Sequence, residues 1–176
     1  VIGQYEGMDV ALCATHDTGS AVEGIPMEGE APYISSGTWS LLGVKTEKPL
    51  TDAESERANW SNEGGVGYNR YQKNIMGMWL VQSLRKEFKH AYTFEELYEL
   101  AHIGRYFTST VDVNDDSFLA PDSMIQAVQD YCERTRQEKP ETECELLYCI
   151  YHSLADCYAR TVSEIEEVTG KRYDTI

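Results

Sequence analysis

The sequence predicts an α/β domain in which strands come first and helices follow from about residue 74. Before that point, short apolar runs alternate with glycine-rich turns, which is typical of strands. After it, apolar residues recur at three- and four-residue steps, the spacing of helices that bury one face. With 176 residues, the chain is long enough for one domain with a sizeable core.

Three apolar runs are expected to form the strands. Residues 10–15 predict a buried strand whose end delivers the polar side chains of His16–Thr18. Residues 33–36 and 40–44 predict two more, joined by a tight hairpin-like turn through Gly37-Thr38-Trp39. These strands would provide the rigid part of the domain.

A polar stretch at residues 45–60 follows these strands. The glycine-rich run Asn62–Gly65 after it is interpreted as a loop. The chain closes with residues 173–176, which resemble the start of another strand. We therefore expect the sheet to be incomplete as written.

The helical half begins with a helix from Asn74, whose apolar residues are Ile75, Met78, Trp79, Val81, Leu84 and Phe88. Thr93 and Glu96 have the spacing of a capping box that opens a second helix to about Ile103. Pro121-Asp122 precedes a third. The last helix has the clearest apolar stripe, and Gly170 is expected to cap its end. The stripe consists of Leu146, Cys149, Ile150, Ser153, Leu154, Cys157, Tyr158, Thr161, Ile165 and Val168.

Charge and composition exclude several classes of partner. The chain has 15 basic and 30 acidic residues, a net charge of −15, which repels nucleic acid and anionic membranes. No apolar run approaches the roughly 18–20 residues of a membrane span. The five cysteines are irregularly spaced without a C-x-x-C pair, which indicates reduced thiols in a cytoplasmic protein. An anion site must therefore use backbone amides, metal ions or positive charge from elsewhere in the protein.

Asp17 is the first candidate for chemistry. A carboxylate just beyond a buried strand can accept a proton from a substrate hydroxyl that attacks a phosphoryl group. The alternative, which spacing alone favours, is that Asp17 caps a short segment at 20–22. Neither interpretation is decided by the residues themselves.

Two further features have equally open interpretations. Gly37 and Thr38 lie in a turn of small residues, where backbone amides and hydroxyls can approach a phosphate, although most such turns are plain hairpins. Asn74 and Gln82 are eight residues apart, so on one helix they would project within roughly 80° of each other. They could face one cleft, or they could be helix caps and solvated amides.

The order of four motifs narrows these alternatives. They are H-D-T-G-S-A-V at 16–22, I-S-S-G-T-W-S-L-L-G at 34–43, N-E-G-G at 62–65 and K-N-I-M-G-M-W-L-V-Q at 73–82. In this order they resemble the FGGY family of carbohydrate kinases, most closely the members that act on L-rhamnulose. The resemblance covers nearly the whole chain, through F-L-A-P at 118–121 and the last helix.

The resemblance implies an incomplete ribonuclease-H-like (actin-like ATPase) domain spanning residues 1–176. It implies that Asp17 is the proton acceptor in the ATP- and Mg²⁺-dependent phosphorylation of L-rhamnulose at its 1-hydroxyl. His16, Asp17, Thr18 and Asn74 would contact the sugar; Gly37, Thr38 and Gln82 would contact the nucleotide. Cys132 and Cys149 match a cysteine pair that can form a disulfide in a relative, although two buried free thiols fit a reducing compartment better.

The same resemblance implies that parts of the enzyme lie outside this chain. The N-terminal kinase domain and the final glycine-rich nucleotide segment would be missing, so we expect the chain alone to be inactive. The alternatives are a kinase of another ketose, such as L-fuculose or L-xylulose, and a non-catalytic sugar-binding module.

Overall fold

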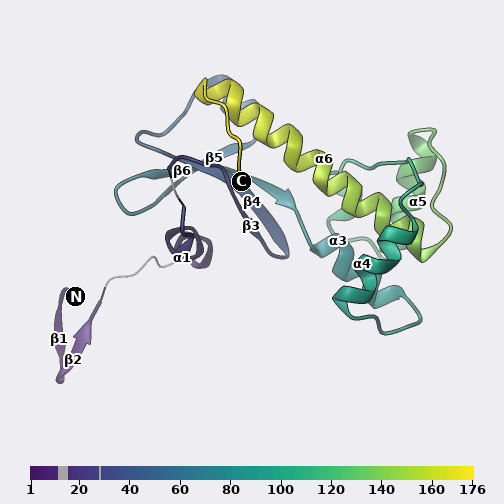
Figure 1. Cartoon of the computed structure of the whole chain (residues 1–176), viewed down its shortest axis with the longest axis horizontal. Helices are drawn as coiled ribbons and strands as arrows, with labels where there is room; N and C mark the ends of the chain where they lie inside the picture. Colours follow the sequence, from purple (N-terminus) through teal and green to yellow (C-terminus); the bar gives the residue numbers. More distant parts are fainter. Residues whose placement is uncertain (12–15, 28) are drawn as a thin grey trace. The chain divides into compact units, whose positions relative to one another are not determined.

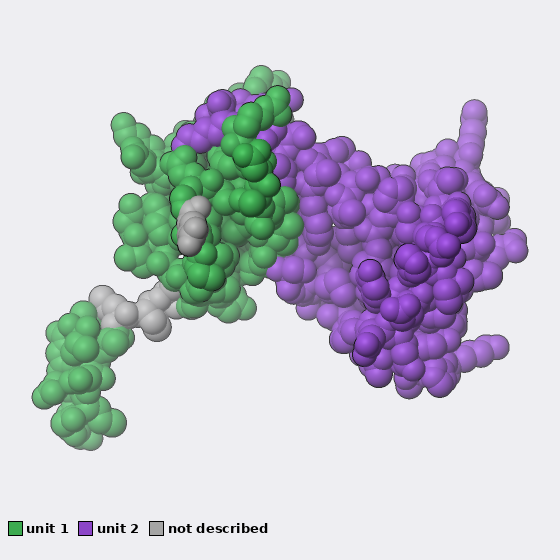
Figure 2. Space-filling view, in the orientation of Figure 1, with its two compact units in different colours: residues 1–35, 41–73, 172–176 green, residues 36–40, 74–171 purple. Residues whose placement is uncertain are grey.

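The computed structural model describes residues 1–11, 16–27 and 29–176. The chain divides into two compact units (Figure 2). The first comprises residues 1–35, 41–73 and 172–176, and the second comprises residues 36–40 and 74–171. The first unit holds most of the strands and the second holds the longer helices. The change of character expected near residue 74 is therefore confirmed.

An N-terminal hairpin precedes the rest of the first unit. Strands β1 (Gly3–Tyr5) and β2 (Met8–Val10) pair antiparallel, and all of their residues are exposed. The strand expected at 10–15 lies largely outside the described residues, which omit 12–15. Val10 ends β2 and is 39 % exposed, so the expected burial at the start of that run is wrong.

A four-stranded sheet is the main feature of the first unit, with its strand ends in the second. Its strands are β3 (Tyr33–Ser36), β4 (Trp39–Thr46), β5 (Trp60–Gly64) and β6 (Asn69–Met76), in the order β3-β4-β6-β5. The two runs expected around the Gly37–Thr38 turn are confirmed as β3 and β4. Because this link is only two residues long, the two neighbouring strands must run antiparallel.

Strand β5 corrects the interpretation of residues 62–65 as a loop. Asn62, Glu63 and Gly64 pair antiparallel with residues of β6, from Asn62↔Tyr71 to Gly64↔Asn69. The run has no apolar alternation, so it gives no strand signal of its own. Pairing with a neighbouring strand makes it extended.

Two short helices and aromatic contacts complete the first unit. Trp60 stacks on Tyr71 with ring centroids 4.5 Å apart. The Tyr71 hydroxyl lies 2.7 Å from the Ser55 hydroxyl of α2 (Ala53–Arg57). Helix α1 (Asp17–Gly24) buries Val22 fully. These contacts bury apolar ring surface on a sheet that has few aliphatic residues.

The second unit is built from helices. They are α3 (Trp79–Glu87), α4 (Phe94–Ile103), the 3-10 turn η1 (Asp116–Phe118), α5 (Met124–Arg134) and α6 (Glu143–Thr169). Helix α6 packs against α3 and α4, and α5 packs against α3 and η1 (Figure 1). No helix in the described ranges is long and apolar enough to cross a bilayer.

Local signals placed α4, α5 and α6 well. Thr93 forms the expected capping box, and α5 begins just after Pro121-Asp122, with Ser123 as its N-cap. The apolar stripe of α6 is buried from Leu146 to Ile165 apart from Tyr158, whereas Val168 is 38 % exposed. Gly170 ends α6 in the left-handed conformation at φ 67°, which glycine adopts without strain.

The expectation of a further strand at residues 173–176 is wrong for this structure. The segment is not in a strand, and the four-stranded sheet does not include it. An apolar or aromatic run becomes a strand only where a neighbour takes up its backbone hydrogen bonds.

Candidate functional site

His16, Asp17 and Thr18 lie at the beginning of α1, in the first unit. His16 is the N-cap residue without a side-chain cap, and Asp17 is the first helical residue. The interpretation of Asp17 as a cap for residues 20–22 is therefore wrong, because the helix begins at Asp17 itself. An acidic residue in this first turn is still favoured by the helix dipole.

The Asp17 carboxylate is solvent-exposed, with 96 % of its side-chain surface accessible. Its Oδ1 accepts a hydrogen bond of 2.7 Å from the backbone amide of Thr18 and lies 3.4 Å from His16 Nδ1. Thr18 is itself buried, which anchors one side of the carboxylate. The three expected sugar contacts are thus adjacent in space, and the Asp17 carboxylate is exposed to solvent.

Gly37 and Thr38 form an exposed turn in the second unit. The turn is held against the start of α3 by backbone hydrogen bonds. The Gly37 carbonyl accepts from Met78 at 3.1 Å, and the Thr38 carbonyl accepts from Gly77 at 3.2 Å and from Trp79 at 3.0 Å. Three amides at the beginning of a helix therefore fix a turn that is distant in sequence.

Asn74 and Gln82 do not lie on one helix as the spacing suggested. Asn74 is an exposed residue of β6, whereas Gln82 is a half-buried residue of α3. The apolar periodicity that predicted a helix from Asn74 runs across two elements, because Ile75 belongs to the strand. Gln82 lies in the first turn of α3, where its backbone N–H donates to the Met78 carbonyl at 2.8 Å.

Gly37, Thr38, Asn74 and Gln82 all belong to the second unit, and His16–Thr18 belong to the first. The structure brings the turn together with the strand-to-helix connection at residues 77–79. Asn114 also holds this connection, since its Oδ1 accepts from the Met76 amide at 2.9 Å. No sequence pattern indicated this role of Asn114, because the residue lies in a loop and outside every predicted element.

The N-E-G-G motif has a structural role that sequence reasoning missed. The Asn62 side chain forms two hydrogen bonds with the backbone of Leu50. Its Oδ1 accepts from the Leu50 N–H at 3.0 Å, and its Nδ2 donates to the Leu50 carbonyl at 2.7 Å. Glu63 Oε2 accepts from Arg70 Nη2 at 2.8 Å. Arg70 is only 3 % exposed, so the motif holds a buried cation in the sheet.

Cys132 of α5 and Cys149 of α6 are buried and are free thiols in the structure. The two side chains interact directly: the hydrogen bond between them lowers the pKa of Cys132 and raises the pKa of Cys149, with burial acting in the same direction at Cys149. Their approach agrees with the expected placement on the last two helices. Formation of a disulfide between them stays a prediction.

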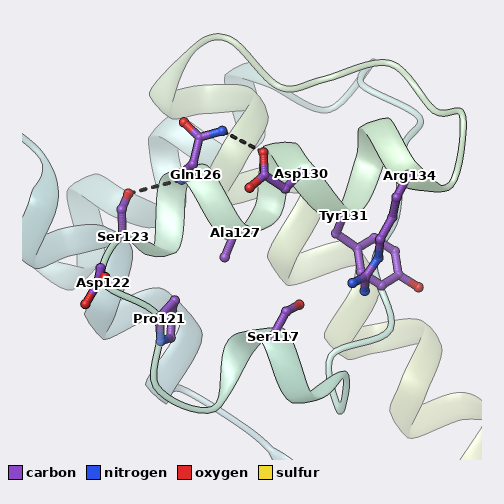
Figure 3. Close-up of a pocket in the computed structure, with 9 residues that line it drawn as sticks. All are labelled: Ser117, Pro121, Asp122, Ser123, Gln126, Ala127, Asp130, Tyr131 and Arg134. Atoms are coloured by element: carbon purple, nitrogen blue, oxygen red, sulfur yellow. Dashed lines mark hydrogen bonds between the residues drawn. The ribbon is translucent and has the colours of Figure 1, made fainter.

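A pocket of about 400 Å³ lies beside α5 and η1 in the second unit (Figure 3), and its lining residues include none of the expected sugar or nucleotide contacts. Its residues are mostly polar, and Gln126 is already bonded to Asp130 at 2.7 Å. Arg134 is paired with Asp115 at 2.6 Å. The wall therefore presents few uncommitted polar groups. The lining residues are Ser117, Pro121, Asp122, Ser123, Gln126, Ala127, Asp130, Tyr131 and Arg134.

Comparison with known proteins agrees with the order of the motifs. A model of the FGGY family of carbohydrate kinases, C-terminal domain, matches residues 32–176. The chain is 45 % identical over 170 residues to a rhamnulokinase of Halalkalibacterium halodurans, covering 96 % of this chain and 36 % of that protein. It is 42 % identical over 169 residues to a rhamnulokinase of Oceanobacillus iheyensis, covering 96 % and 36 %.

A third relative, the rhamnulokinase of Bacillus subtilis, is 42 % identical over 164 residues, covering 92 % of this chain and 34 % of that protein. The chain thus spans about a third of the length of these relatives. The combination of a β-sheet with helices fits the α/β fold class expected from the motifs. The chain therefore belongs to the FGGY family of carbohydrate kinases, and its residues 32–176 match their C-terminal domain.

Proposed function

We propose that the full-length protein transfers the γ-phosphoryl group of ATP to the 1-hydroxyl of L-rhamnulose, and that this domain supplies the proton acceptor, Asp17. The observation that carries the proposal is the exposed Asp17 carboxylate at the start of α1, within a chain whose relatives are named rhamnulokinase. Because the chain spans a third of those relatives, the activity is proposed for the full-length protein.

In the proposed reaction, the sugar O1 attacks the γ-phosphorus while its proton passes to Asp17. The new O1–phosphorus bond forms as the bond from phosphorus to the β,γ-bridging oxygen breaks, and ADP leaves with that electron pair. His16, Thr18 and Asn74 would orient the sugar. The Thr18 amide and His16 Nδ1 support the carboxylate, so positioning and general base catalysis act at one place.

ATP is a substrate of this reaction, and Mg²⁺ enters with its phosphates and neutralises the charge that develops on them. The exposed Gly37–Thr38 turn, with its threonine hydroxyl, fits contact with a phosphate. Its carbonyls already accept hydrogen bonds from the backbone amides of residues 77–79, so they do not oppose an anion. Gln82, in the adjacent first turn of α3, would contact the nucleotide. The net charge of −15 makes a metal-bound phosphate the favoured form.

The test is ADP release by the full-length protein on a panel of L-rhamnulose, L-fuculose and L-xylulose. L-Rhamnulose is expected to give the highest kcat/KM, and Asp17→Asn should lower kcat by about 10²–10⁴-fold with ATP affinity retained. Asp9→Asn, at an exposed residue of β2, is the matched control. Preference for another ketose would reassign the substrate, and sugar binding without turnover would indicate a binding module. The 176-residue chain alone is expected to be inactive.

A further inference from the structure

The Gly37–Thr38 turn is supported from behind by a buried residue of β4. Ser40 follows the turn by two residues and has no exposed surface. Its hydroxyl lies 2.6 Å from the hydroxyl of Tyr158. Tyr158 belongs to α6, 118 residues further along the chain. One hydroxyl pair therefore connects the long helix of the second unit to the strand that carries the turn.

The space for this pair depends on the missing side chain of Gly77. A Cβ atom at Gly77 would lie 2.5 Å from Ser40 Oγ and 2.8 Å from the Ser40 amide nitrogen, closer than van der Waals contact allows. Gly77 is also the residue whose amide donates to the Thr38 carbonyl. Ser40, Gly77 and the turn therefore form one closely packed group. Tyr158, on α6, forms a hydrogen bond with the Ser40 hydroxyl of this group.

We propose that Tyr158 is a positioning residue that acts through Ser40 to hold the Gly37–Thr38 turn in the geometry that receives the phosphates of ATP. The proposal rests on the proposed function, in which Thr38 contacts those phosphates. The proposed role of Tyr158 is therefore indirect and requires no contact with substrate. A buried hydroxyl that loses this hydrogen bond must either stay unsatisfied or move, and movement of Ser40 displaces the turn that adjoins it.

The experiment uses the full-length protein with Tyr158→Phe, Ser40→Ala and the double substitution. Tyr148→Phe is the matched control, since it removes the same hydroxyl from the same helix about 15 Å away along its axis. Tyr158→Phe is expected to raise the KM for ATP about 2- to 10-fold, the size of effect that one hydrogen bond produces. The KM for the ketose should stay within the range of Tyr148→Phe.

Non-additivity separates the proposed link from general loosening. Because both single substitutions break the same hydrogen bond, the double variant should be no worse than Ser40→Ala. An equal rise in both KM values, additive effects, or a KM for ATP no higher than in Tyr148→Phe would overturn the proposal. Thermal unfolding of each variant shows whether enough folded protein is present for the comparison.

Amide hydrogen exchange tests the positioning step without any activity. In Tyr158→Phe, the amides of Gly77, Met78 and Trp79, which donate to the turn, should exchange faster than in Tyr148→Phe. Unchanged exchange would overturn the proposal. If the unsubstituted protein phosphorylates no ketose, the proposed function fails, and the exchange result still decides whether Tyr158 holds the turn.

Discussion

Replacing Glu63 with Gln should destabilise the first unit by leaving the Arg70 guanidinium buried without a counter-charge. The two residues lie directly opposite each other in the β5–β6 pair, and Arg70 Nη2 donates to Glu63 Oε2 at 2.8 Å. The Arg70 side chain is 3 % exposed and that of Glu63 is 34 % exposed. Arg70 Nη1 has no hydrogen-bond partner in the described part of the chain, so Glu63 carries most of the compensation.

The magnitude follows from the difference in burial. Removing one partner of a buried ion pair costs about 3–5 kcal/mol, and partial exposure of Glu63 reduces this to about 2–3 kcal/mol. Glu54→Gln is the matched control, because Glu54 and Arg57 are 3.9 Å apart with 84 % and 75 % of their side chains exposed. Its expected cost is below about 1 kcal/mol.

Urea unfolding can be followed through Trp60, which is stacked on Tyr71 in the same unit, once Trp39 and Trp79 are replaced by Phe. Combining Glu63→Gln with Arg70→Met removes both charges and should recover much of the lost stability. If Glu63→Gln costs no more than Glu54→Gln, or if the double variant is less stable than the single one, Glu63 does not compensate the buried charge of Arg70.

Two smaller effects are expected in the second unit. The side-chain hydrogen bond from Arg134, helped by that from Ser117, lowers the pKa of Asp115 to about 2. A lowered carboxyl pKa stabilises the fold above about pH 4, and this stabilisation is lost as the pH falls towards 2; after allowance for solvent screening it amounts to about 1 kcal/mol. Asp115→Asn should therefore flatten the pH dependence of unfolding below pH 4, and an unchanged slope would contradict this assignment. Thr142→Ala removes the hydroxyl that accepts the Glu145 amide at 3.2 Å in the α6 capping box and should cost about 1 kcal/mol, whereas Thr142→Ser should cost much less; equal losses by chemical denaturation would rule out the cap as the cause.

Helices were predictable here because their signals are local. The capping box of α4 needs only Thr93 and Glu96, and the end of α6 needs only Gly170. The burial of α6 follows from a stripe written in the sequence at helical spacing. Each of these features is decided by residues within a few turns of one another.

Strands β5 and β6 were missed because their cause is not local. Trp60–Gly64 is extended through its pairing with Asn69–Lys73, and its polar and glycine residues carry no period-two pattern. For the same reason Asn74 was assigned to a helix, although β6 continues to Met76. The helical periodicity near Ile75 is a coincidence at the junction between a strand and a helix.

The candidate phosphate turn shows why the order of the motifs was more informative than any motif alone. Taken singly, the motif I-S-S-G-T-W-S predicts a hairpin, and the motif K-N-I-M-G-M-W-L-V-Q predicts the start of a helix. In the structure, the carbonyls of the Gly37–Thr38 turn accept the amides of residues 77–79. Two segments separated by some forty residues are therefore one structural group.

This joining also limits which atoms of the turn are left for a ligand. The amides at the beginning of α3 are the groups that would ordinarily bind an anion at a helix N-terminus, and three of them are occupied by the turn. The helix dipole thus acts on the turn, and in the proposed function it is the exposed turn itself that contacts a phosphate. The hydrogen bonds from residues 77–79 go to the carbonyls of the turn, and Thr38 is exposed. In the proposal above, the position of the Thr38 hydroxyl depends on the support that Ser40 receives from Tyr158.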